Sequence, residues 1–568
     1  MTERVALAIA FTFALMLIFA GTGTLPLLDP DEGRNAQVAR EMAASGHWAV
    51  PTYAGLPYLD KPALYFGMVA LSFRVLGISE TTARLPSGVF AVALLLLVYG
   101  FCRSEYGVRT AILAVVVVAS MPMFFAFSRL VIFDMPLAFF VSAAIVAGYH
   151  AEKSEGRARR RWYLLGAAAA GLATLIKGPI GIILPTLVLF SSAVMDRRSG
   201  VVRRLLAPGN LAVFAAFVVP WVVAVSLQRP DFLRYGLLNE TLSRFATPAF
   251  ARTQPFFYYG PVLAASCYGW SLLLPESALI AWRRRTAWQR ADRLLVVWTI
   301  TVVAFFSLSQ SKLPGYVLTA VVALGVLVAR LFDRAIENPE GAAARVVLRG
   351  ATMAAMSSLA LGVWLALEML APGYLTSMFH ITGRAYQRAR PIFPTIFAII
   401  AISGLAVAAA RVSRRVWSVF AAFVVFPAAV LTIGFDGMRQ YAEDASASQL
   451  AARVEELAPT ATVACVQCYP PGLPFYLDRP VALISDDGSE TTSNYIPYYL
   501  AQLDSWPAPM IPFERRHEWL RERDGAVLLL GRPEVQVTMD ELVGTANRTE
   551  GELPGGWRYV LFIEPTSS

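Results

Sequence analysis

Apolar residues along this chain gather into long runs, and short polar connections separate each run from the next. An α-helix needs roughly 20 apolar residues to cross the hydrocarbon core of a bilayer, and most of these runs approach that length. We therefore expect about 13 transmembrane helices in a polytopic α-helical membrane protein. The expected spans lie near residues 5–21, 82–102, 110–127, 133–150, 162–176, 179–195, 210–227, 258–280, 294–309, 314–331, 350–371, 392–410 and 416–434.

The first apolar run, Val5–Ala20, has the position of either a signal peptide or a first membrane span. No small-residue cleavage site of the usual kind follows it, and an acidic pair comes soon after. We therefore expect the run to be retained as a span.

The pattern changes after residue 435. Glu443–Leu457 has the spacing of an amphipathic helix, and helical patterns alternate with short β-type runs further on. The expected strands are Ala461–Val466, Val481–Ser485, Val527–Leu530 and Tyr559–Ile563. Alternating strands and helices indicate a small α/β domain. We expect this domain at 436–568, after a membrane domain at 1–435.

Composition agrees with a membrane protein, since 56% of the residues are hydrophobic and only 16% are charged. A soluble chain carries about 25% charged residues. The net charge of +9 comes largely from clusters in short loops between apolar runs, at 157–161, 197–204, 283–293 and 411–415. Lys and Arg in such loops mark the cytoplasmic side, so we expect no nucleic-acid partner and an N-terminus inside the cell.

The same alternation places the remaining loops and the tail outside. The outer loops are 22–81 and 228–257, the turns near 128–134 and 177–179, and the segments 309–316 and 372–391. The stretch 34–45 of the first loop has helical spacing. A loop of about sixty residues is too long for a plain connector, so we expect it to carry function.

Carboxylates stand at the mouth of the expected bundle on this outer side. Asp31 and Glu32 follow the first span, and Asp134 begins the fourth. Acids at the edge of an apolar bundle are costly unless they handle a substrate, a proton or an ion. The alternative is that they cap helices, because an acid near a helix N-terminus is stabilising.

Cations lie on the same expected face. Lys61, Arg244 and Lys312 are candidates for binding a lipid phosphate. Lys177 is a further candidate cation for this phosphate, and Tyr316 could donate a hydrogen bond to it. For the lysines, anchoring at the bilayer interface is the alternative. A transporter would place its ionisable groups near the bilayer midplane. The one-sided pattern instead predicts an enzyme whose acids and cations meet in one outward-facing pocket.

Two further motifs leave alternatives open. A divalent metal ion could bind carboxylates such as Asp31, Glu32 or Asp60, although no His pair has metal-ligand spacing. Cys465 and Cys468 form a Cys-x-x-Cys pair, which is typical either of redox chemistry or, in an oxidising compartment, of a local disulfide.

Five segments together resemble the bacterial aminoarabinose lipid A transferases, which belong to the GT-C class alongside protein O-mannosyltransferases. The resemblance covers roughly residues 1–435 in matching order. The segments are Asp29–Ala36 with Arg40–Met42, Tyr58–Pro62, Thr174–Pro179, Ser243–Ala246 and Ser311–Tyr316.

This resemblance implies a GT-C fold and an undecaprenyl-phosphate sugar donor, with 4-amino-4-deoxy-L-arabinose as the sugar. It implies inverting transfer to a lipid A phosphate at the periplasmic face of the bacterial inner membrane, a lipopolysaccharide modification linked to polymyxin resistance. Asp31 matches the family's catalytic carboxylate and Asp134 its second acidic residue. Lys61, Arg244 and Tyr316 match groups that hold the lipid phosphate.

The chain departs from the family pattern at two points. Asp60 stands where relatives carry Glu, and Glu240-Thr241 stands where we expect Glu-His, which puts a metal ligand of some relatives in doubt. Two rival functions stay open: a transferase of the same architecture that modifies a protein or another glycan, and a flippase for lipid-linked sugar.

Overall fold

The computed structural model describes residues 2–243, 247, 253–283, 285–373, 386, 390–544 and 548–563. The chain divides into two compact units that each combine separate stretches of sequence. The first unit comprises Met1–Thr22, Arg84–Val223 and Leu237–Met438, and the second comprises Gly23–Ala83, Ala224–Gly236 and Arg439–Ser568. The first long loop therefore folds with the tail, while the division of the sequence at residue 435 stays a prediction.

The first unit is helical. Four of its elements, α4, α11, η1 and α23, include a few residues that belong to the second unit, Tyr235 among them. In chain order the elements are α1 (Glu3–Phe19), α4 (Glu80–Tyr106), α5 (Val108–Ser120), α6 (Pro122–Phe127), α7 (Asp134–Lys153), α8 (Gly156–Lys177), α9 (Ile180–Met195), α10 (Val201–Leu205), α11 (Pro208–Gln228), η1 (Tyr235–Ser243), α14 (Tyr259–Ser266), η2 (Trp270–Leu273), α15 (Leu274–Arg283), η3 (Arg285–Ala287), α16 (Arg290–Leu308), η4 (Pro314–Val317), α17 (Leu318–Glu337), α18 (Ala342–Leu370), η5 (Arg390–Ile392), α21 (Phe393–Val412), α22 (Val416–Ala429), η6 (Val430–Gly434) and α23 (Phe435–Asp444).

Eight helical segments within the described residues are long and apolar enough to cross a membrane. They are Glu80–Tyr106, Asp134–Lys153, Pro208–Gln228, Arg290–Leu308, Pro314–Glu337, Ala342–Leu370, Arg390–Val412 and Val416–Asp444. The chain is thus a multi-pass membrane protein, as the apolar runs predicted. The count of about 13 crossings is not confirmed, because several expected spans correspond to shorter or broken helices.

Two expected spans are interrupted for local reasons. Met121 is extended (φ −68°, ψ 128°) and precedes Pro122, so the range 110–127 divides into α5 and α6. A residue before proline is disfavoured in the helical region. Gly269 has φ +83°, a left-handed value that glycine adopts readily, and it divides the range 258–280.

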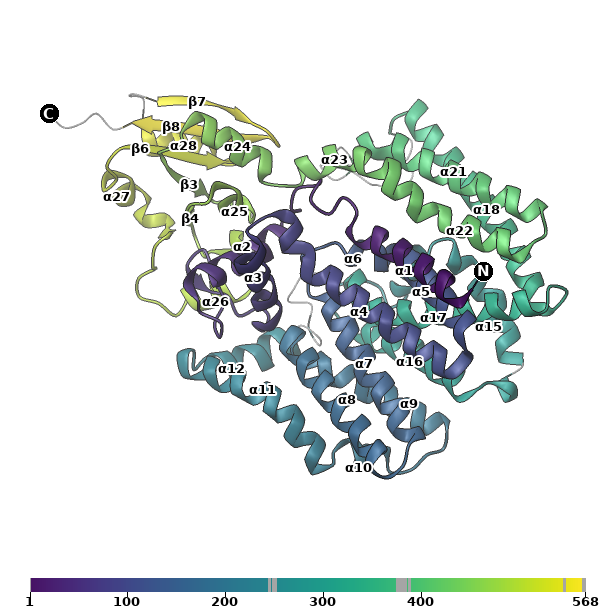
Figure 1. Ribbon diagram of the computed structural model, residues 1–568. Coiled ribbons are helices and arrows are strands. Elements are labelled where there is room, and N and C mark those ends of the chain that lie inside the picture. The colour runs from purple at the N-terminus through teal and green to yellow at the C-terminus, as the bar shows by residue number, and fades with distance from the viewer. Residues whose placement is uncertain are drawn as a thin grey trace. The chain divides into compact units, whose positions relative to one another are not determined.

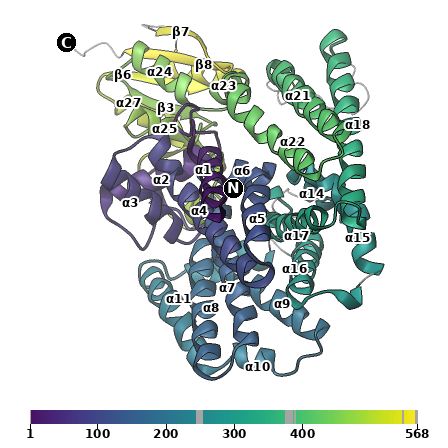
Figure 2. The ribbon, with the colours of Figure 1, turned by 45° about the vertical axis from the view of Figure 1, so that its right-hand side comes forward.

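Helices α7, α8 and α9 pack against one another, as do α18 and α21 (Figures 1 and 2). The turn that leads into α7 is tied to the end of α1 by a buried arginine. Arg129 donates hydrogen bonds to the carbonyls of Leu17 at 2.6 Å and Ile18 at 3.2 Å. These bonds satisfy carbonyls that the end of a helix leaves without partners. They also fix the chain five residues before Asp134.

The second unit contains a six-stranded sheet in the order β5-β4-β3-β6-β8-β7 (Figure 1). Strands β5, β4, β3 and β6 are parallel, while β8 is antiparallel to both β6 and β7. The strands are β3 (Thr462–Val466), β4 (Ala482–Ser485), β5 (Met510–Pro512), β6 (Ala526–Gly531), β7 (Arg548–Leu553) and β8 (Trp557–Ile563). Its core joins strand side chains with Leu520 and Met539. The predicted α/β tail is therefore confirmed.

The sheet also corrects the prediction. Strands β5 and β7 were not expected, since β5 has three residues and β7 is a polar edge strand. The single helix expected at 443–457 is interrupted, because α23 ends at Asp444 and α24 begins at Ser448. The other short elements of the tail are α24 (Ser448–Leu457), α25 (Leu473–Leu477), η7 (Ser489–Thr491), α26 (Tyr495–Leu500), η8 (Phe513–Arg515), α27 (Arg516–Arg521), η9 (Pro533–Val535) and α28 (Gln536–Val543).

The first loop contributes α2 (Asp31–Ser45), a hairpin of β1 (Thr52–Tyr53) and β2 (Leu56–Pro57), and α3 (Leu64–Leu76), while the segment before η1 contributes α12 (Phe232–Arg234). The helix expected at 34–45 is thus confirmed. Arg40 of α2 donates to the Phe475 carbonyl at 2.5 Å and pairs with Asp478. Tyr53 donates to the Pro471 carbonyl at 3.1 Å. Residues 471–478 of the tail therefore hold the loop.

Candidate functional site

Three residues named from the sequence meet at one end of the first unit. Asp134 is the first residue of α7, and Lys177 is the last residue of α8. The Lys177 ammonium donates to Asp134 Oδ1 at 2.8 Å and lies 5.0 Å from the centre of the Tyr316 ring. The exposed fraction of the side chain is 15% for Lys177 and 14% for Asp134. A paired acid and cation held against an aromatic face form a partly desolvated site.

A tight backbone turn completes this cluster. The segment η4 carries Tyr316 and approaches Asp134 so closely that a Cβ on Gly315 would lie 2.8 Å from Asp134 Oδ1. Lys312 precedes the turn, is buried, and donates to the Ser309 carbonyl at 2.5 Å. Its ammonium group therefore stabilises the loop, and its predicted phosphate contact stays a prediction.

The cluster and the arginine-rich segments lie at opposite ends of the same helices. Asp134 begins α7 and Lys177 ends α8, whereas α7 ends at Lys153 and α8 begins just before Arg157. A helix of 20 residues is about 30 Å long, close to the thickness of the bilayer core. Within this unit, the candidate acid is therefore on the side opposite to the basic loops, as the one-sided pattern predicted.

In the second unit, Asp31 begins α2 and its side chain is 62% exposed. Arg34, one helical turn later, holds Asp31 Oδ1 at 2.5 Å while its own side chain is only 11% exposed. The other guanidinium nitrogen donates to Thr492, at 2.9 Å to the carbonyl and 2.6 Å to the hydroxyl. Burial lowers the pKa of Arg34, but neighbouring Tyr58 and acidic groups raise that pKa by more. Arg34 thus stays charged and orients Asp31.

Asp60 is buried and accepts hydrogen bonds through both carboxylate oxygens. The Asn494 backbone N–H donates at 3.0–3.1 Å, that of Tyr495 at 2.8 Å, and the Tyr235 hydroxyl at 3.1 Å. The next residue, Lys61, donates from its ammonium group to the Asp60 carbonyl at 2.6 Å. Asp60 therefore anchors the loop that presents Lys61.

The surroundings of Asp60 and Glu32 bear on two of the predicted roles. Hydrogen-bond donors engage both oxygens of Asp60, so its carboxylate is not arranged as a metal ligand. Across the part of the chain that the structure describes, no group of three His, Cys, Asp or Glu side chains is placed to hold a metal ion. A metal at Asp31 stays a prediction. Glu32 is buried and its carboxylate accepts the Leu28 backbone N–H at 3.1 Å, and its predicted catalytic role stays a prediction.

Two other sequence features have different outcomes. Arg244 lies outside the described residues. Cys465 and Cys468 are free thiols, so the structure contains no disulfide between them. A hydrogen bond with Cys468, together with burial, raises the pKa of the Cys465 thiol. A raised pKa disfavours the thiolate that redox chemistry requires.

Asp29 is a buried acid that the sequence did not single out. A Cβ on Gly33 would lie 2.1 Å from Asp29 Oδ1, so only glycine fits beside it. Burial raises the pKa of Asp29 from its ordinary value of 3.8 to about 7, although a Gly472 backbone hydrogen bond and Arg34 act in the opposite direction. The folded second unit therefore favours the protonated form of Asp29.

The stability of the full chain should consequently fall as pH rises from about 4 to 7. Across this window the unfolded state has lost the Asp29 proton and the folded state keeps it, which costs up to about 1.4 kcal/mol per pH unit. Asp29→Asn should remove this part of the pH dependence of Tm in detergent. Asp504→Asn, at an exposed acid of the same unit, is the control. Parallel pH profiles for wild type and Asp29→Asn would contradict the assignment.

Comparison with known proteins defines the class first. A family model described as dolichyl-phosphate-mannose-protein mannosyltransferase matches residues 60–223. The structure resembles the crystal structure of ArnT from Cupriavidus metallidurans bound to undecaprenyl phosphate, with a TM-score of 0.81 and 24% identity over 98% of this chain and 97% of that one. The fold is that of the GT-C class of membrane glycosyltransferases.

Curated relatives identify the family. An undecaprenyl phosphate-alpha-4-amino-4-deoxy-L-arabinose arabinosyl transferase of Serratia proteamaculans is 30% identical over 424 residues, 73% of each chain. Another from Pseudomonas paraeruginosa is 32% identical over 65% of this chain and 68% of its own. The chain belongs to this arabinosyl transferase family. It spans about half the length of a third relative, from Pseudomonas aeruginosa, at 35% identity (52% of this chain and 54% of that one).

Proposed function

We propose that this chain transfers 4-amino-4-deoxy-L-arabinose from an undecaprenyl-phosphate donor to a phosphate of lipid A, at the periplasmic face of the bacterial inner membrane. The observation that carries the proposal is the family membership over 73% of the chain, since those relatives are named for this donor and sugar. The arginine-rich loops at the end of the bundle opposite Asp134 support the orientation.

In this reaction an acceptor oxygen attacks the anomeric carbon of the sugar, and the bond from that carbon to the lipid-phosphate oxygen breaks. The configuration inverts and undecaprenyl phosphate leaves with an additional negative charge. Lys61 and Lys177 neutralise this charge, together with Arg244, Lys312 and a hydrogen bond from Tyr316. Stabilising charge that develops in the transition state is usually the largest catalytic contribution.

Asp31 acts on the acceptor side of the same reaction. A lipid A phosphate is already an anionic nucleophile, so Asp31 orients it or stabilises the positive charge that develops on the sugar. A hydroxyl acceptor would instead need Asp31 as general base. Asp134 holds Lys177 in place through the 2.8 Å contact, and Glu32 supports the backbone before Asp31.

The test uses the purified full chain with undecaprenyl-phosphate aminoarabinose and lipid A, and measures both products by mass spectrometry. Aminoarabinose on lipid A, with release of equal amounts of undecaprenyl phosphate, is the expected result. The match to a protein mannosyltransferase model favours one second candidate, transfer to a protein. Sugar found on protein acceptors alone would support that candidate, and intact donor crossing proteoliposomes without bond cleavage would indicate a flippase.

Thr492 should be a positioning residue for this reaction, because it holds the arginine that orients Asp31. Thr492→Val removes the hydroxyl acceptor at nearly constant volume and should lower kcat about tenfold with KM little changed. Thr492→Ser should restore the rate. Thr549→Val, at an exposed threonine of β7, is the matched control. Equal kcat values for Thr492→Val and Thr492→Ser would contradict this role.

A further inference from the structure

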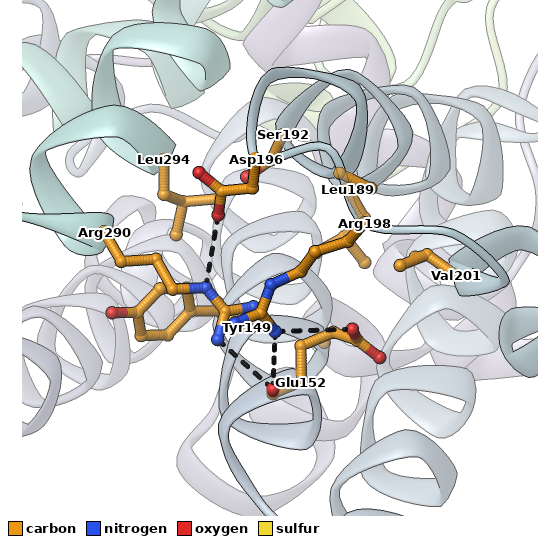
Figure 3. Close-up of a pocket in the computed structure, with 11 residues that line it drawn as sticks. Tyr149, Glu152, Leu189, Ser192, Asp196, Arg198, Val201, Arg290 and Leu294 are labelled. Carbon is orange, nitrogen blue, oxygen red and sulfur yellow. Dashed lines mark hydrogen bonds and ion pairs between the residues drawn. The ribbon is translucent and has the colours of Figure 1, made fainter.

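A polar cavity lies in the first unit at the end of α7 that is opposite Asp134. It opens between the end of α7, the end of α9 and the start of α16 (Figure 3). Leu189, Val201 and Leu294 form apolar parts of its wall, and Glu152, Asp196, Arg198 and Arg290 form the charged parts. The reaction proposed above uses none of these residues.

The two carboxylates of the cavity already have close arginine partners. Arg204 binds both oxygens of Glu152, at 2.8 and 2.9 Å. Arg293 donates to Asp196 at 2.6 Å. These two contacts neutralise the acidic groups through charge-assisted hydrogen bonds.

Arg198 and Arg290 add two further positive charges. Each donates to the same oxygen, the backbone carbonyl of Glu152, at 2.9 Å and 3.2 Å. Their nearest carboxylate contacts are longer, 3.7 Å from Arg198 to Glu152 and 3.4 Å from Arg290 to Asp196. Figure 3 shows both arginines among the residues that line the cavity, and the Arg290 guanidinium lies 5.1 Å from the centre of the Tyr149 ring. Four guanidinium groups thus share two carboxylates, and two like charges converge on one carbonyl.

Convergent guanidinium groups with an excess of positive charge suit a phosphate anion, which arginine binds through paired N–H donors. Basic pockets between membrane helices on the cytoplasmic side are where acidic lipid headgroups bind. The buried apolar wall beside the arginines suits the start of an acyl chain.

We propose that this cavity is a second anion site, separate from the transfer site, that binds a phosphate group between Arg198 and Arg290. The phosphate belongs either to an acidic phospholipid headgroup or to a soluble phosphate. Two of the four positive charges at the cavity are not balanced by its two carboxylates, and a bound phosphate would balance them.

The experiment measures Tm of the full chain in nanodiscs of phosphatidylcholine, with increasing phosphatidylglycerol in one arm and inorganic phosphate in the other. Wild type should be stabilised in at least one arm, and the arm that responds identifies the source of the phosphate. Arg198→Gln with Arg290→Gln should weaken the apparent affinity about tenfold per arginine. Arg345→Gln, at an exposed arginine of the same chain, should respond as wild type does.

Arg198→Gln alone covers the case in which the double variant does not fold, because Arg198 is 39% exposed and its loss leaves the Arg204–Glu152 pair intact. A weaker response in the single variant supports the site. Equal responses of wild type and Arg198→Gln in both arms, or stabilisation of wild type in neither arm, would overturn the proposal.

Discussion

Asp31→Asn should lower the rate of aminoarabinose transfer about 1,000-fold, because the substitution removes a charge that the reaction uses while keeping the shape of the side chain. Stability should change little, since Asp31 is 62% exposed and the buried Arg34 keeps its hydrogen bonds to the Thr492 carbonyl and hydroxyl. Initial rates with purified chain, donor and lipid A give the first quantity, and Tm in detergent gives the second.

Asp504→Asn provides the matched control for Asp31→Asn, since Asp504 is an exposed acid in the same unit. It should transfer at the wild-type rate. Undecaprenyl phosphate should still bind to Asp31→Asn, because the proposed phosphate contacts come from other residues. A wild-type transfer rate in Asp31→Asn would remove Asp31 from the mechanism.

Lys177→Met should have the second largest effect, on transfer and on stability together. Loss of the ammonium removes a proposed phosphate contact, for which we expect about a 100-fold lower transfer rate. It also leaves the Asp134 carboxylate, 14% exposed, without its 2.8 Å partner. Breaking a buried pair in this way costs about 3–5 kcal/mol.

A second substitution separates the two effects of Lys177→Met. Adding Asp134→Asn removes the unpaired charge, so the double variant should regain most of the lost Tm without regaining transfer. Recovery of transfer in parallel with Tm would mean that Lys177 acts only through folding.

The membrane helices could be predicted from the sequence because their signal is local. Every expected span falls at least in part on a helix of the structure, and the breaks at Met121 and Gly269 follow from proline and glycine effects that a window of hydropathy averages out. In the tail, four strands are rich in apolar residues and were expected. The charged residues of β7 hid that strand.

Residues of the candidate site could be predicted from the sequence, but the contacts between them could not. Asp31, Asp134, Lys177 and Tyr316 were named from motifs, but the sequence held no sign that Lys177 pairs with Asp134. Contacts between Arg34 and Thr492 join residues 458 positions apart, and no local pattern predicts such a contact.

Asp60 is the instructive difference. Its sequence context resembles a metal or substrate ligand, yet its carboxylate serves backbone N–H groups more than 430 residues away. The signal that could have found the role of Arg34 is its position three residues after an acid at a helix start, where an ion pair is favourable.

The most direct test of the proposed activity is the mass of lipid A from bacteria that lack their own aminoarabinose transferase but make the donor. With this chain expressed, we expect lipid A to gain the mass of one aminopentose on a phosphate, and with Asp31→Asn expressed to equal levels we expect no gain. Unmodified lipid A in cells that express the wild-type chain in the membrane would contradict the proposed acceptor and the proposed reaction.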